Sequence, residues 1–304
     1  MTTAAHKFIT IDRADLSAPI FAVTGADAIA VKAGTILTID GVKTTFEQDG
    51  PIEIASLVPG QDYAVRLGAE GTPVAAPAGP DCGSDTATFG GFHYAPSGNA
   101  DARAGGDAAP AINPLSCWDV GFRPACPDPR GMALVDGKVW VDIYLLGTNH
   151  LDDGTSHCGA LIADGRDLPQ QVDGKGRTKK LDYATAVAIY AHHGKQLLGA
   201  EEFFAAAYGV TERQSRDAEP TETGDVSGDG KKFVSRAGIL DATGTMWQWG
   251  TDGDPDNPRP ALFGGSWFSG RSAGSHCADL VYDWPGHSVG DFSARGRSDH
   301  LSPA

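Results

Sequence analysis

The chain has 304 residues, 41% of them hydrophobic and 21% charged, which is enough to bury a sizeable core in one large domain or in two. Its formal net charge of -15 argues against nucleic acids and anionic membranes as partners, because both carry charge of the same sign. Forty glycines and nineteen prolines indicate a body rich in turns rather than a bundle of helices.

The N-terminal sequence lacks the basic and apolar segments of a secretory signal, and it has no small-residue cleavage site. We therefore expect a protein made in the cytoplasm without a signal peptide. No run of about eighteen apolar residues occurs, so no insertion into a membrane is expected.

The five cysteines are odd in number, widely spaced and without a C-x-x-C pair. This pattern argues against a zinc knuckle and requires no disulfide framework. Cys117 and Cys126 could form a disulfide, but free or buried thiols are the favoured interpretation.

Short β-rich runs divided by glycine, aspartate and proline occupy residues 1–70: FITI, IFAV, AIAV, TILTI, VKTTF, PIEIA and DYAVRL. Asp40-Gly41 stands between two alternating runs, which is typical of a β-hairpin. We predict a small all-β module over residues 1–70. The Gly/Ala/Pro-rich residues 71–80 are predicted to be a linker.

Residues 81–304 are predicted to form an α+β domain with two helices and many loops. The apolar run Val139–Leu146 is typical of a buried strand. A helix is expected over residues 181–194, because apolar positions recur at helical spacing until Gly194. A second helix is expected over residues 199–209, which begins with acidic residues and ends at a glycine.

Two polar motifs could carry chemistry. Asp252, Asp254 and Asp256 alternate as at the start of a calcium loop, but Phe263 stands where the closing glutamate belongs, so solvated turn residues are favoured over calcium. His192 and His193 stand at the end of the first expected helix, where the helix dipole favours an imidazolium. Capping is favoured there over metal binding.

Four stretches together resemble a known fold. Residues 181–209 resemble a helix, a GKRLPT-type turn and a second helix; GTMWQWGTD resembles a GNVWEWTSD strand; ALFGGSWFSGRSAGS resembles an RGGSW…RSA segment; and SARGRSDHL is similar to a GARG…DHL ending. They resemble the C-type-lectin-like fold shared by formylglycine-generating enzymes and diversity-generating-retroelement variable proteins. The resemblance covers roughly Phe122 to Leu301. The β module before it looks unlike the N-terminal region of a phage relative in that family.

The resemblance implies a variable region over about residues 264–301. In the family, Asn codons AAY become NNY during retroelement mutagenesis, and an NNY codon never specifies Lys, Gln, Glu, Met or Trp. FSGRSAGSHCADLVYD and PGHSVGDFS, on either side of Trp284, contain no Lys, Gln, Glu or Met. Alternate residues of an extended segment share one face, so the variable residues would form a recognition surface.

The residues expected to contact the ligand are all encodable by NNY codons: Phe268, Ser269, Ser272, Asp279, Val281, Tyr282, Asp283, His287, Val289, Asp291 and Phe292. The aromatic members are expected to supply most of the binding energy, and the charged members orientation. The residues expected to hold the backbone as a scaffold are Gly264, Gly265, Trp267, Trp284, Arg295, Asp299 and His300.

The function implied by the resemblance is ligand or receptor binding without catalysis, by a phage or prophage tail-tip adhesin. Its partner would be a cell-surface or protein ligand, and its place the virion or a cell surface. The phage relative suggests a trimer, which would raise avidity. A third interpretation is a tail or surface subunit whose C-terminal segment is an ordinary loop.

The enzymatic alternative is a metal-dependent oxidase or sulfoxide synthase of the formylglycine-generating-enzyme fold. In that family copper is bound by a cysteine pair near the C-terminal strands, but only Cys277 lies there in this sequence. The synthases use three histidines on a preceding domain, whereas the β module contains only His6. No metal and no other cofactor is therefore expected.

Overall fold

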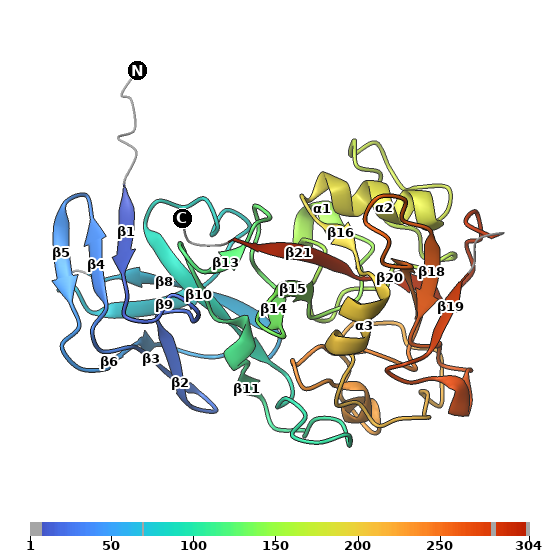
Figure 1. The fold of residues 1–304 in the computed structure, drawn as a ribbon, viewed down its shortest axis with the longest axis horizontal. Coiled ribbons are helices and arrows are strands. Elements are labelled where there is room, and N and C mark those ends of the chain that lie inside the picture. The colour runs from blue at the N-terminus through green and yellow to red at the C-terminus, as the bar shows by residue number, and fades with distance from the viewer. Residues whose placement is uncertain (1–7, 69, 281–283, 302–304) are drawn as a thin grey trace.

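The N-terminal part of the protein is built from short, twisted strands (Figure 1). The structure is a computed structural model that describes residues 8–68, 70–280 and 284–301. The strands of this part are β1 (Ile9–Asp12), β2 (Phe21–Gly25), β3 (Ala28–Val31), β4 (Ile36–Ile39), β5 (Val42–Thr45), β6 (Gly50–Pro51), β7 (Glu53–Ile54), β8 (Gln61–Leu67), β9 (Pro73–Pro77), β10 (Thr88–Ala95), β11 (Ala111–Ile112) and β12 (Trp118–Asp119).

These strands form three sheets around one apolar core. Their orders are β1-β4-β5, β2-β3-β6 and β11-β10-β8-β9-β7, with β12 also paired to β10. The expected hairpin is present between β4 and β5, where Asp40 and Gly41 have φ values of 52° and 82°. A two-residue turn of this kind needs positive φ at both positions, which aspartate tolerates and glycine prefers. Phe21, Val31 and Tyr63 lie in the buried cluster between the sheets.

The predicted linker over residues 71–80 is wrong, because Pro73–Pro77 forms β9 inside a sheet. It pairs antiparallel with β8 and parallel with β7. Ala75 is buried in the core, so the small side chains fill a narrow space rather than leaving the segment without anchors. The prolines stand at the two ends of the strand, where a missing N–H costs little.

The C-terminal part combines helices with two further sheets. Its elements are β13 (Arg123–Pro124), β14 (Met132–Val135), β15 (Val139–Asp142), α1 (His150–Asp153), α2 (Tyr183–His192), β16 (Gln196–Leu197), α3 (Ala200–Ala206), β17 (Trp247–Thr251), β18 (Pro260–Phe263), β19 (Ala278–Leu280), β20 (Phe292–Ala294) and β21 (Gly296–Leu301). Short 3-10 turns cover Pro114–Ser116, Gly230–Phe233 and Gly270–Ser272. The two expected helices are therefore present as α2 and α3, and the expected buried strand begins as β15.

The last strand, β21, joins segments that are far apart in the sequence. It pairs with β13, β15 and β16, and Figure 1 shows it running through the middle of the molecule. The other sheet has the order β19-β18-β17-β20. Only Arg295 separates β20, in one sheet, from β21, in the other. The chain that follows the 264–292 region therefore passes directly into the core. The structure is thus an α+β protein with more strand than helix.

Candidate functional site

The region expected to carry function begins at the end of β18, an inner strand of one sheet, and returns to the same sheet as its edge strand β20. The 264–277 loop precedes β19, and the 284–291 loop precedes β20. Between them, Val281, Tyr282 and Asp283 lie outside the described residues. Both ends of the region are strands with buried neighbours, so the two loops are carried by a rigid frame.

Two consecutive glycines turn the chain at the start of the 264–277 loop. Gly264 and Gly265 have φ values of 87° and 77°, and a Cβ at Gly265 would lie 2.9 Å from the Cα of Ala273. A residue with a side chain would be strained and would clash here. The Gly264 N–H donates to the Cys277 carbonyl at 2.9 Å and closes the loop. The backbone at these two positions therefore favours glycine.

Five of the expected contact residues are exposed: Phe268, Ser272, Asp279, His287 and Val289. Phe268 is 63% exposed and lies edge-on against Trp267, with ring centroids 5.1 Å apart. Trp267 itself packs on a buried cluster beneath it. The structure thus presents an apolar ring to solvent on a support of core residues.

Three expected contact residues instead face inward. Phe292 packs against the apolar cluster that contains Trp249, with ring centroids 5.5 Å apart at 90°. The Ser269 hydroxyl accepts a hydrogen bond from the Ser266 N–H at 2.9 Å. Burial raises the pKa of the Asp291 carboxyl, and a hydrogen bond from Ser266 opposes that shift. Asp291 and Phe292 lie where the chain re-enters the sheet, and Ser269 turns inward within the 264–277 loop, which the codon criterion could not indicate.

Arg295 is the scaffold residue with the most extensive contacts. Its guanidinium is fully buried, and Nε donates to Gln248 Oε1 at 3.0 Å. Nη1 and Nη2 donate to the main-chain carbonyls of Asp142, Ile143, Leu240 and Asp241. Desolvation lowers the pKa of Arg295 to about 10, and the nearby Asp241 carboxylate opposes this. All five donors of the side chain are used.

Of the remaining residues predicted as scaffold, His300 contacts the core, whereas Asp299 and Trp284 are exposed. The His300 Nδ1 accepts a hydrogen bond from Trp140 Nε1 at 2.8 Å, which ties β21 to the core. Asp299 is exposed and paired with Arg297. Trp284 is not a buried support, since it is 57% exposed and stacks on His287 in solvent. It belongs with the exposed side chains, and its NNY-incompatible codon misdirected the prediction.

The 284–291 loop is docked mainly through its backbone, and one side chain adds to this, since the Ser288 hydroxyl accepts a hydrogen bond from the Leu181 N–H at 2.8 Å. The Gly165 N–H donates to the Val289 carbonyl at 3.0 Å, and the Tyr183 N–H donates to the Pro285 carbonyl at 3.1 Å. A Cβ at Gly165 would approach Val289 N to 2.3 Å. Main-chain contacts of this kind do not depend on which side chain a position carries. The loop can therefore change its exposed residues and keep its path.

Sequence reasoning missed other exposed residues of the same region. Arg271 and His276 are exposed on the 264–277 loop, and Leu280 is exposed on β19. All three residue types are encodable by NNY codons, so the codon criterion alone would have included them. Leu280 lies between the alternate positions that were selected, and Arg271 and His276 lie on a loop to which the alternation of an extended strand does not apply.

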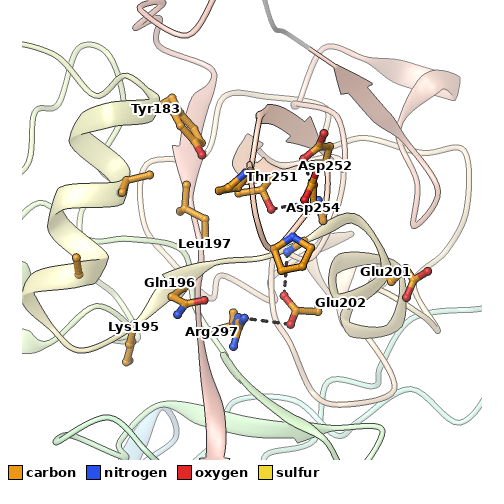
Figure 2. A pocket seen from close by; sticks show the side chains of 16 residues that line it. Tyr183, Lys195, Gln196, Leu197, Glu201, Glu202, Thr251, Asp252, Asp254 and Arg297 are labelled. Atoms are coloured by element: carbon orange, nitrogen blue, oxygen red, sulfur yellow. Dashed lines mark hydrogen bonds and ion pairs between the residues drawn. The ribbon is translucent and has the colours of Figure 1, made fainter.

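A cleft of about 690 Å³ lies between α2, β16, α3 and the 251–258 loop (Figure 2). Tyr183 lines it and connects it to the 284–291 loop, because its N–H donates to the Pro285 carbonyl. Glu202 accepts a hydrogen bond from the Gly199 N–H at 2.8 Å and faces Arg297. Asp252, at the far wall, is paired with Arg259 at 2.8 Å. Much of the negative charge that faces the cleft is thus matched by partners from the same chain.

The alternating aspartates are organised as turn residues. Asp252 accepts hydrogen bonds from main-chain N–H groups of Arg259 and Asp254, and the Arg259 contacts lower its pKa. Asp254 accepts in turn from the Asp256 N–H at 3.0 Å. Within the part of the chain that the structure describes, no three His, Cys, Asp or Glu side chains gather to hold a metal ion.

His193 contradicts the expected imidazolium at the end of α2. Burial, with a smaller contribution from the neighbouring His150, lowers its pKa to about 3. Its Nε2 lies 2.9 Å from His150 Nδ1, and His150 Nε2 lies 2.8 Å from the Gln170 carbonyl. A carbonyl only accepts, so His150 carries its proton on Nε2 and His193 donates from Nε2. Both rings are neutral, and burial outweighs the helix dipole.

The cysteines give no sign of redox or metal chemistry. All five are free thiols, so the possible Cys117–Cys126 disulfide is absent. Burial, with a smaller contribution from Asp279, raises the pKa of Cys277 to about 11. A thiol in that state is a poor nucleophile and a poor metal ligand near neutral pH. Over residues 8–68, 70–280 and 284–301, no helix is long and apolar enough to cross a membrane.

Comparisons with known proteins agree along almost the whole chain. The tail fiber receptor-binding protein of Bordetella phage BPP-1 is 40% identical, over 95% of this chain and 84% of that protein. The chain belongs to the Major Tropism Determinant family. The structures of the M1 and I1 variants of the Major Tropism Determinant match with TM-scores of 0.87 and 0.88, each at 38% identity and over 96% of this chain. The matches cover 85% and 86% of those structures.

The likeness to the Major Tropism Determinant family also includes the N-terminal part. A family model, the Mtd second domain, matches residues 19–119. The expectation that this part looks unlike the phage relative is therefore wrong. Its short β-rich runs carry too few distinctive residues for the likeness to be seen from motifs alone. The relatives are named for receptor binding and tropism, not for an enzymatic activity.

Proposed function

We propose that this protein is the receptor-binding protein of a phage tail fibre and that it acts without catalysis. Its ligand would be a molecule on the host cell surface, contacted by the exposed residues of the 264–277 loop, β19 and the 284–291 loop. The observation that carries this proposal is that the region separates exposed side chains from the buried groups that fix its backbone. Exposed side chains such as Phe268 stand on a backbone fixed by buried groups such as Arg295.

We further propose that the C-terminal part has a C-type-lectin-like fold and that its loops are diversified by a retroelement. Family membership supports both statements. The exposed residues Phe268, Ser272, Asp279, His287 and Val289 are all NNY-encodable. Sequencing the surrounding DNA tests this directly. A reverse-transcriptase gene with a near-identical template repeat is expected, and its absence would remove the diversification proposal.

The test of binding compares two sets of variants. Alanine at the exposed positions should abolish adsorption to host cells and leave the melting temperature nearly unchanged, because exposed side chains make few contacts within the fold. These positions are Phe268, Ser272, Asp279, His287 and Val289. The matched control is Lys43→Ala, at an exposed position of β5 outside these loops. If the alanine set unfolds the protein as readily as a change at Arg295, the exposed surface is part of the fold and the proposal fails.

The virion is the proposed location, and a homo-oligomer, in the form of a trimer, is the proposed assembly. Linking several weak sites would raise the overall affinity for a cell surface. Sedimentation that gives a monomer at high protein concentration would exclude the trimer. No metal or cofactor is part of the proposed function. Stoichiometric copper or iron in the purified protein would favour the oxidase alternative instead.

A further inference from the structure

Two side chains outside the diversified region hold the 264–277 loop. Glu212 and Ser215 come from a short segment that precedes β17 by about thirty residues. Glu212 contacts the end of the loop at Ser275, and Ser215 contacts its middle at Gly270. The two contacts lie on either side of the exposed residues Arg271 and Ser272.

The Glu212 carboxylate uses both oxygens on one residue of the loop. Oε2 accepts a hydrogen bond from the Ser275 N–H at 3.1 Å, and Oε1 accepts from the Ser275 hydroxyl. The carboxylate also closes the space beside the preceding residue, since a Cβ at Gly274 would lie 2.3 Å from Oε2. Ser275 is 1% exposed, so these charge-assisted bonds are shielded from water.

Ser215 fixes the start of the 3-10 turn. Its hydroxyl accepts a hydrogen bond from the Gly270 N–H at 3.0 Å. Gly270 has a φ of 56° and open space around the position of a Cβ, so its backbone direction rather than its packing needs support. A hydroxyl from another segment supplies that support directly to the main chain.

The segment that carries both residues is itself tied to the core. The Thr211 N–H donates to the Lys232 carbonyl at 2.8 Å, and the Arg216 N–H donates to the Gly244 carbonyl at 2.8 Å. The Arg216 guanidinium pairs with the buried Asp241 at 2.5 Å. Arg295 contacts the main chain of the same aspartate. The support of the loop is therefore continuous with the buried network of Arg295.

We propose that Glu212 and Ser215 are positioning residues that fix the backbone of the 264–277 loop whatever its exposed side chains are. The inference rests on the proposed binding function, and it extends that function by separating positions that can vary from those that cannot. Phe268, Arg271 and Ser272 are free to change. Gly274 and Ser275 are not, because one faces the Glu212 carboxylate at close range and the other supplies both of its donors.

Amide hydrogen exchange on the full chain tests this without any ligand. Glu212→Ala should speed exchange at Ser275 roughly tenfold to a hundredfold, as expected for losing a bond to a charged acceptor. Ser215→Ala should speed exchange at Gly270 by less. Glu212→Gln should restore most of the protection, since its amide offers an oxygen to the Ser275 N–H and an NH₂ to the hydroxyl. The matched control is Glu201→Ala, an exposed glutamate that faces the cleft.

Unchanged exchange in Glu212→Ala would overturn the proposal. So would a fall in melting temperature as large as that of Arg295→Ala, because Glu212 would then support the whole fold rather than the loop. Adsorption to host cells separates this inference from the function on which it rests. Weakened adsorption by Glu212→Ala, restored in Glu212→Gln, supports both. If the wild-type protein does not adsorb while exchange behaves as expected, the binding function is wrong and the positioning role stands.

Discussion

At the scale of single residues, Arg295 shows how a buried charge can be a stable part of a fold. Moving a guanidinium out of water is costly unless every donor finds an acceptor. Four main-chain carbonyls and Gln248 satisfy all of its N–H groups. These acceptors come from β15, from the segment before β17 and from β17 itself. One side chain thus connects three segments directly beneath the 264–292 region.

Replacing Arg295 by alanine should destabilise the protein by about 3–5 kcal/mol, because the carbonyls remain buried without donors. Lysine should recover little of the loss, since a single ammonium cannot reach acceptors on both sides as the planar fork does. Urea denaturation followed by tryptophan fluorescence measures both variants. The control is the exposed Arg271→Ala, which should change stability by less than about 0.5 kcal/mol. If Arg295→Ala also lowered the free energy of unfolding by less than about 0.5 kcal/mol, the assigned role would be wrong.

Residue types and family motifs predicted part of this site. Gly264, Gly265 and Arg295, the first arginine of SARGRSDHL, follow from the resemblance, and all three are buried. The exposure of Trp284 and the burial of Phe292 could not be predicted, because both depend on where the chain rejoins a sheet. Glu212 gave no signal in the sequence, since its partner Ser275 lies sixty-three positions away.

At the scale of elements, the contact between α1 and the end of α2 depends on neutral histidines. Burial lowers the pKa values of both His150 and His193, the latter to about 3. Arg177 and Lys195 face the pair with positive charge, the neighbouring His192 further disfavours its protonation, and Asp152 opposes them at His150. Protonation would place two imidazolium rings against each other and would remove the acceptor at His150 Nδ1.

Stability should therefore fall as the pH drops from 7 to 5. The unfolded chain protonates these histidines near pH 6.5 while the folded protein keeps them neutral, so the unfolded state binds more protons in this window. Each such histidine contributes a slope of up to about 1.4 kcal/mol per pH unit below its unfolded pKa. His193→Gln should flatten the slope of the unfolding free energy measured in urea. The exposed His276→Gln is the control, and equal slopes in the wild type and His193→Gln would refute the assignment.

The loop between β17 and β18 is expected to be insensitive to calcium. Asp252 already has a cationic partner in Arg259, together with main-chain donors. Millimolar calcium should leave the melting temperature of the wild-type protein unchanged. Arg259→Ala frees the carboxylate and serves as the comparison. A rise of several degrees in the wild-type protein, reversed by a chelator, would show that the alternating aspartates do bind the ion.

Local patterns predicted helices and hairpins better than they predicted sheets. The β4–β5 hairpin and both helices were expected from residues that are neighbours in the sequence. Strand β9 was not, because alanine and proline have low strand propensity and form a strand here only between two partners. The same holds for β21, whose pairing with β13, β15 and β16 spans up to 178 positions, from Arg123 to Leu301.

At the scale of the whole molecule, polar side chains connect the N-terminal sheets to the C-terminal part. The Asp62 carboxylate accepts from the Gly131 N–H at 2.9 Å and lies 3.1 Å from His93 Nδ1. His93 Nε2 lies 2.8 Å from the Tyr144 hydroxyl, which belongs to the C-terminal core. Asn113 donates across the same junction to the Ala237 carbonyl. These polar groups form hydrogen bonds across the junction, which two loosely connected domains would lack.

The two parts should therefore unfold in one cooperative transition. Asp62→Ala removes an acceptor from a main-chain N–H of the other part and should lower stability by about 2–3 kcal/mol. Because the transition is shared, the urea midpoint should shift equally when it is followed by hydrogen exchange in strands β2–β5 and in strands β17–β20. Asp49→Ala, which removes only the acceptor for the Ala33 N–H within the N-terminal part, is the comparison. If Asp62→Ala shifts one set of strands and leaves the other in place, the junction does not couple the parts. In that case the N-terminal sheets fold independently of the region that carries the exposed loops.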